Sequence, residues 1–70
     1  MRIEYDKEAD AAYIYFSKKY VKKTVNVNSS LNIDLDEKGN LIGIELLDVS
    51  RQLPRTMLEK AVQVGTPAFA

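Results

Sequence analysis

The fold is decided by the stretch LNIDLDEKGNLIGIELL, residues 31–47. Its first six residues alternate strictly between apolar and polar side chains, which predicts a β-strand with one buried face and one solvated face. The next four, EKGN, form a hairpin loop in which Gly39 supplies the positive φ angle that short loops of this kind require. Residues 41–47 then return as a second, antiparallel strand. On this strand the residues expected to face the core are Ile42, Ile44 and Leu46.

Three more strands are predicted upstream of this hairpin. Residues 2–5 alternate between polar and apolar side chains, and residues 11–16 are rich in the aromatic and β-branched residues that favour strands. Residues 21–27 place three valines on one face. The lysines of this third strand are typical of a sheet edge, where charge discourages pairing with stray chains.

A helix is predicted over residues 54–64, after the sheet. Pro54 suits the first helical turn, where its missing amide is not needed, and Gly65 is placed to end the helix. Apolar residues recur at helical spacing and form one stripe: Leu53, Met57, Leu58, Ala61 and Val62. Residues 66–70 are expected to form a loose tail.

The predicted fold class is α+β, with residues 1–70 forming a single domain. Residues 2–50 make the sheet core, an antiparallel β-meander of about five strands, and one C-terminal helix packs on it. A chain of this size buries only about 60% of its unfolded surface. It therefore needs a disulfide, a metal, an unusually good core or a partner subunit. Since the sequence has no cysteine and no histidine, a partner subunit is a serious option.

The charge pattern gives no reason to expect a membrane. Ten basic and ten acidic side chains cancel, so no long-range field favours an anionic surface. No apolar run approaches the roughly 20 residues that span a bilayer. The charged start of the chain does not look like a signal peptide. We therefore expect a cytoplasmic protein.

Two motifs carry a resemblance to a known family. They are YDxEADAxYI at residues 5–14 and DxDxxGNLIGIELLDVS at residues 34–50. Together they resemble the short prokaryotic proteins catalogued as domain of unknown function 2283, over residues 2 to about 53. The resemblance implies a small antiparallel β protein with no assigned activity and no catalytic residues. It also suggests an antitoxin or other accessory role, because some members are encoded beside small toxin-like proteins.

We expect no catalytic residues and no cofactor. Without cysteine and histidine, the usual thiol nucleophile and near-neutral base are missing. The candidates for a carboxylate-based metal site are Asp34, Asp36 and Glu45, which fall at positions 1, 3 and 12 of an EF-hand-like loop. Lys38 occupies position 5, where a ligand is needed, and the flanks are predicted strands. A hairpin followed by a core strand explains these acids without a metal.

A lysine-rich segment is the candidate for contact with nucleic acid. Its residues are Lys18, Lys19, Lys22 and Lys23, and Tyr20 lies among them. Lysines of this kind bind phosphates, and a tyrosine can stack on a base. The zero net charge favours the alternative, a solvated edge whose lysines keep the protein soluble.

A further set of residues is predicted to contact a protein partner. Tyr13, Tyr15, Leu41 and Leu47 lie on the strand face opposite the predicted core. Either the helix covers them or another chain does, because aromatic residues on an open face are enriched at interfaces. The helix adds Met57 and Leu58 to the candidate interface.

These features give one functional hypothesis and two alternatives. The hypothesis is a non-enzymatic protein-interaction module, a homodimer and an antitoxin-like or regulatory partner of another small protein. The alternatives are a nucleic-acid-binding accessory protein and a carboxylate-based metal site.

Overall fold

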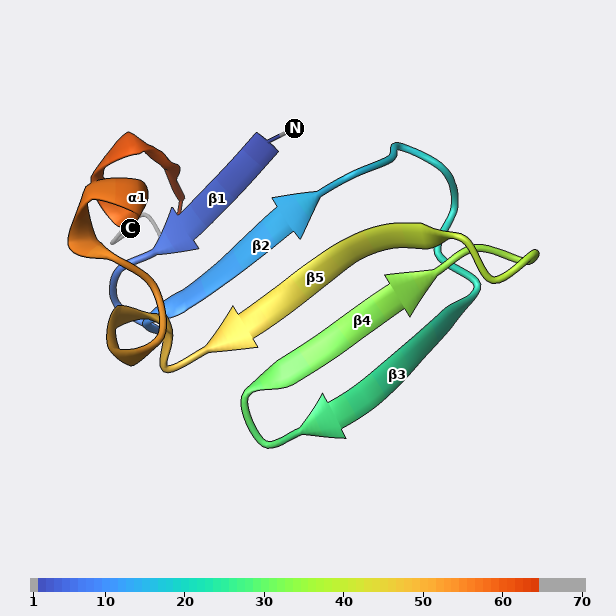
Figure 1. Ribbon diagram of the computed structural model, residues 1–70. Helices are drawn as coiled ribbons and strands as arrows, with labels where there is room; N and C mark the ends of the chain where they lie inside the picture. Colours follow the sequence, from blue (N-terminus) through green and yellow to red (C-terminus); the bar gives the residue numbers. More distant parts are fainter. Residues whose placement is uncertain (1, 65–70) are drawn as a thin grey trace.

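The structure, a computed structural model, describes residues 2–64 (Figure 1). In chain order the elements are β1 (Arg2–Asp6), β2 (Ala11–Tyr15), β3 (Lys23–Asn28), β4 (Leu31–Leu35), β5 (Leu41–Leu47), the 3-10 helix η1 (Val49–Arg51), α1 (Arg55–Lys60) and β6 (Val62–Val64). The predicted tail at residues 66–70 lies outside the described residues.

The strand order across the sheet is β3-β4-β5-β2-β1-β6. All neighbours are antiparallel except β1 and β6, which are parallel. The predicted α+β class is confirmed, because the protein is a mainly antiparallel sheet with one short helix near its C-terminus. A simple meander would place β3 beside β2, but β5 lies between β2 and β4. The lysine-bearing third strand does lie at the edge, as predicted.

The connection from β2 to β3 explains why the third strand begins later than predicted. It must cross β5 and β4, three strand spacings or about 14 Å, to reach the far edge. That crossing uses residues 16–22, so Val21 belongs to the connection and the strand starts at Lys23. The hairpin between β4 and β5 has the predicted form, with Gly39 at a φ of 84°.

The two faces of the sheet differ in chemistry. The cross-strand register aligns one row of aliphatic side chains, consisting of Val25, Ile33, Ile44, Ile14 and Ile3. We call these five residues the aliphatic row. The next row on the same face consists of Leu31, Leu46, Ala12 and Tyr5. The alternate positions form the opposite, largely polar face.

The predicted helix over residues 54–64 is wrong in its second half. The helix ends at Lys60, and Ala61 is extended, with φ −74° and ψ 156°. The chain then forms β6, which pairs with the outer edge of β1. A helix of one or two turns has little stability of its own, so the chain after Lys60 pairs the β-branched Val62 and Val64 with the open edge of β1 and does not continue the helix.

Among residues 2–64, the structure contains no helix that could span a membrane.

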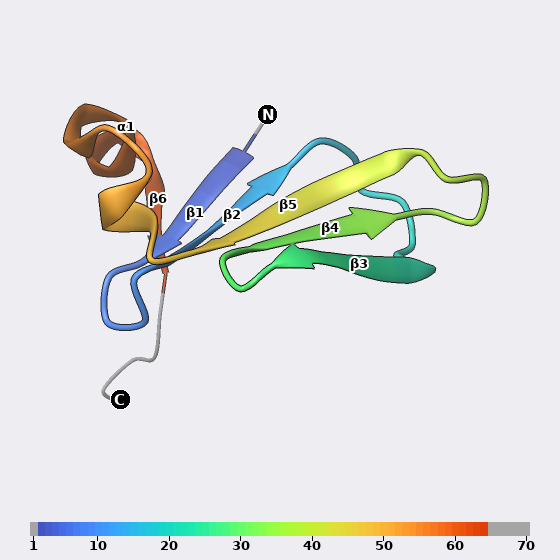
Figure 2. The ribbon, with the colours of Figure 1, turned by 60° about the horizontal axis from the view of Figure 1, so that its bottom comes forward.

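Burial is concentrated at one end of the sheet. There η1 and α1 stand over the end of β1 and the start of β2 (Figure 2). The buried cluster contains Ala12, Val49 and Leu58, with Tyr5, Leu46 and Leu53 packed against it. Within residues 2–64, Ile42 is the one other buried apolar side chain. The helices therefore cover the row next to the aliphatic row, not the aliphatic row itself.

Asp10 fastens this helical layer to the sheet. Its carboxylate accepts hydrogen bonds from the Ser50 hydroxyl (2.7 Å), the Ser50 amide (3.1 Å) and the Tyr5 hydroxyl (3.2 Å). These hydrogen bonds, above all the one from the Ser50 hydroxyl, lower the pKa of Asp10 below its ordinary value. Asp10 therefore links the β1–β2 turn to η1, forty residues further along the chain.

Candidate interaction surface

The aliphatic row is a contiguous apolar line across five strands of the sheet. Each of its five side chains is half-buried, so part of each is accessible to solvent. All five are β-branched, a residue type that fits the pleated surface of a sheet. Figures 1 and 2 show α1 and η1 at one end of the sheet, away from β3 and β4. Only at the β1 end does α1 approach the row, where Met57 and Ile3 line one hollow.

The opposite face carries a network of side-chain hydrogen bonds that joins all of β1 to β5. Tyr15 donates to Glu4 (3.0 Å), Tyr13 to Asp34, Thr24 to Asp34 (2.6 Å), Asn32 to Glu45 (2.8 Å) and Asn26 to Asn32 (2.7 Å). Hydrogen bonds from Arg2 and Tyr15 lower the pKa of Glu4. The carboxylates of this face are thus engaged within the fold.

Tyr13 reaches across β5 to make its hydrogen bond. Its neighbour on β5 at the crossing is Gly43, and a Cβ atom there would lie 2.5 Å from the Tyr13 hydroxyl oxygen and 2.6 Å from its Cζ. The ring therefore occupies the space that a side chain at position 43 would need. Burial, followed by the hydrogen bond to Asp34, raises the pKa of Tyr13, so its hydroxyl remains a donor.

The three candidate metal ligands serve three structural roles. Asp34 and Glu45 lie on the polar face, bound to Tyr13 and Asn32 respectively. Asp36 is buried in the β4–β5 turn and accepts hydrogen bonds from the amides of Lys38 (2.9 Å) and Asn40 (2.8 Å). In the part of the chain that the structure describes, no three acidic side chains converge as a metal site would require.

Lowering the pH is expected to destabilise the hairpin through Asp36. Hydrogen bonds, first of all from the Asn40 amide, hold the pKa of Asp36 below its ordinary value. Such a carboxylate stabilises the fold above its unfolded pKa of about 4, and this contribution is lost as the pH falls through the folded value. Between about pH 6 and pH 3, the melting temperature should therefore fall further in the wild type than in Asp36→Asn, which cannot titrate.

The matched control for this experiment is Glu37→Gln. It removes the same charge from the exposed neighbouring position and leaves the hydrogen bonds of the turn in place. Its pH dependence should follow that of the wild type. Equal pH dependence in the wild type and Asp36→Asn would show that Asp36 does not stabilise the fold through its charge.

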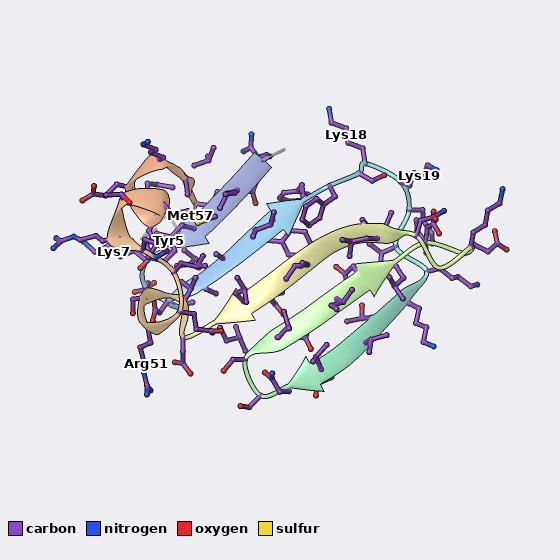
Figure 3. All side chains as sticks on the ribbon, viewed as in Figure 1. Tyr5, Lys7, Lys18, Lys19, Arg51 and Met57 are labelled. Carbon is purple, nitrogen blue, oxygen red and sulfur yellow. The ribbon has the colours of Figure 1, made fainter. Side chains whose placement is uncertain are left out.

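The lysine-rich segment forms the tip of the sheet farthest from α1. Figure 3 shows Lys18 and Lys19 at this end. A hollow of about 400 Å³ there is lined by Lys19, Tyr20, Lys22, Asp36, Glu37 and Lys38. Tyr20 is 83% exposed. Two acids, Asp36 and Glu37, lie among the lysines, so the tip has mixed charge and is not uniformly basic.

Comparison with known proteins assigns the chain to a family. Residues 2–50 match the family described as Protein of unknown function (DUF2283). The chain belongs to this family. Over 51 residues it is also 39% identical to an uncharacterized protein, MJ0789, of Methanocaldococcus jannaschii. That match covers 73% of this chain and 43% of the relative, so the chain spans less than half of the relative's length. No solved structure matches the chain.

The matched range contains both faces of the sheet. It runs from the start of β1 into η1, so the whole aliphatic row and the polar network belong to the part shared with the DUF2283 family. The resemblance inferred from the two motifs is confirmed. As predicted, the C-terminal helix lies beyond the family match, as does β6.

The structure distributes the predicted interface residues over four environments. Tyr13, Tyr15 and Leu47 lie on the polar face, where the two tyrosine hydroxyls bind carboxylates. Leu41 is 39% exposed at the start of β5. Met57 is half-buried on α1, where it lines a hollow with Ile3 and is labelled in Figure 3. Leu58 is a correction: it is 6% exposed and packs in the core, so it offers no surface to a partner.

Proposed function

We propose that this domain is a non-enzymatic protein-interaction module that binds its partner on the aliphatic row. The proposal rests on one observation: five β-branched side chains form a continuous, half-buried line across five strands. Isolated exposed apolar residues are common on proteins, but large contiguous apolar patches mark interaction sites.

The chemistry of the chain supports a role without catalysis. The sequence has neither cysteine nor histidine, so nucleophilic and general-base mechanisms of the usual kinds lack their residues. The carboxylates of the polar face are held by neighbouring donors. An antitoxin-like or regulatory role fits this chemistry, since a module that docks by surface burial acts by covering a site on its partner.

The test is affinity capture with two matched variants. Val25→Lys adds a charge to the aliphatic row at the edge strand β3, whereas Thr24→Lys adds the same charge on the opposite face of the same strand. Tagged wild type and Thr24→Lys should each retain a stoichiometric protein at high salt, either another protein or the endogenous copy of this chain. Val25→Lys should retain about tenfold less, because burying an unpaired ammonium in an apolar interface is costly.

Two outcomes would count against the interaction module. One is a set of captured proteins that is the same for Val25→Lys and the wild type, since the aliphatic row would then play no part in binding. The other is nucleic acid as the bound species, released by salt, which would favour the lysine-rich tip. Circular dichroism of each variant confirms that a lost partner does not reflect a lost fold.

A further inference from the structure

We infer that the partner of the aliphatic row is a second copy of this chain, stacked face to face to form a two-layer sandwich. This inference rests on the proposed function, because it names the occupant of the same surface. In the dimer the two aliphatic rows would lie between the sheets and form a shared core, with both polar faces outward.

The first argument is the size of the core within one chain. Four apolar side chains are buried in residues 2–64: Ala12, Ile42, Val49 and Leu58. A stable domain needs two packed layers around one core, yet here the second layer covers only one end of the sheet. With no cysteine or histidine for a disulfide or a zinc site, a partner subunit is one way to complete the core.

The second argument is the chemistry of the row. Its five members are aliphatic, so it offers no charge or hydrogen-bonding group with which to select a particular foreign partner. Interfaces between identical subunits are more apolar than those of transient complexes and resemble a domain core cut in half. The net charge of zero at pH 7 means that two copies meet without overall repulsion.

The third argument is area. Five strands at a spacing of about 4.8 Å span about 24 Å, and the five residues of β4 are about 17 Å long. The flat footprint of this whole face, including the part under η1 and α1, is therefore about 400 Å². An interface of at most this size per partner lies at the low end of protein–protein interfaces, so the dimer is expected to be weak and to form in the micromolar range.

Ile44 is the residue expected to lie nearest the two-fold axis of the proposed dimer. In a two-fold interface the same patch meets itself, so the centre of the patch lies near the symmetry axis. Ile44 is the middle member of the row, on the third of its five strands. Packed sheets lie about 10 Å apart with interdigitating side chains, which brings the two copies of Ile44 together.

Sedimentation equilibrium across the micromolar range tests the inference. We expect the wild type and Thr24→Lys to have the mass of a dimer, and the Kd of Val25→Lys to be at least tenfold higher, as for an unpaired charge at a buried interface. In this cysteine-free chain, Ile44→Cys should give a covalent dimer on mild oxidation, whereas Thr24→Cys, on the opposite face, should not.

Each other result overturns the inference in a recognisable way. A wild type that stays monomeric overturns it. If the wild type is monomeric and still captures another protein that Val25→Lys no longer captures, the proposed function stands without the dimer. A dimer that is unchanged in Val25→Lys, or that Thr24→Cys cross-links as readily as Ile44→Cys, places the contact elsewhere. If Val25→Lys does not fold, the cysteine pair decides alone.

Discussion

Gly43→Ala is expected to lower the free energy of unfolding by about 1–3 kcal/mol, the usual cost of forcing extra atoms into a packed site. A Cβ at this position would overlap the ring of Tyr13, which crosses β5 on its way to Asp34. The ring must then move outwards, and its hydrogen bond to Asp34 is lost. For a domain this small, whose core rarely supplies more than about 3–5 kcal/mol, the change is large. Denaturation curves at one fixed protein concentration measure it.

A double-mutant cycle separates this explanation from a general intolerance of side chains at position 43. In a Tyr13→Ala background the space above Gly43 is free, so Gly43→Ala should stabilise the fold by about 0.5–1 kcal/mol, because glycine weakens a strand relative to alanine. The effect of Gly43→Ala on the free energy of unfolding is thus expected to change sign when the Tyr13 ring is removed. If Gly43→Ala costs the same in both backgrounds, the Tyr13 ring is not the cause.

Local patterns in the sequence predict the first five strands of this protein, but not β6. Strict alternation over residues 31–36, and the apolar Ile42, Ile44 and Leu46 at every second position of the next strand, assign side chains to a face, because the pleat reverses direction at every residue. Gly39 predicts the turn, since few other residues adopt its φ of 84° readily. The lysines of the third strand predict an edge, and β3 is one. Each of these features depends on residues that are close in sequence.

The features that the sequence does not reveal depend on distant parts of the chain. The strand order places β5 between β2 and β4, and no local pattern specifies which strand pairs with β2. For the same reason the crossing of Tyr13 over Gly43 is hidden, although a glycine inside a strand often marks a close approach. A tyrosine on a strand looks apolar in a sequence pattern, yet the hydroxyls of Tyr5, Tyr13 and Tyr15 each donate to a carboxylate.

The open aliphatic row was partly visible in the sequence. Alternation places Ile33 and Ile44 on the face predicted to be buried, but whether that face is covered depends on the length of the helical layer. A helix over residues 54–64 would have had nearly twice the length of the six-residue α1. Because the chain turns into β6 after Lys60, the covered area is smaller than the apolar stripe at residues 53–62 suggests.

Leu58→Ala is expected to destabilise the fold by about 2–4 kcal/mol, as for other buried leucines whose removal leaves a cavity. Leu58 is 6% exposed and joins α1 to Ala12 on the sheet and Val49 in η1. A six-residue helix is not stable alone, so α1 depends on this contact. We therefore expect amide hydrogen exchange to become faster first over α1 and then over β6, which follows it directly.

Met57→Ala is the matched control, because it shortens the preceding, half-buried side chain on the same helix. It should cost less than about 1 kcal/mol, since its side chain is only partly removed from water. Measuring self-association in both variants also decides between two roles for Leu58. If Leu58→Ala lowered the affinity between subunits but not the unfolding free energy, Leu58 would be a partner contact. Loss of stability together with fast exchange in α1 would place Leu58 in the core of a single chain.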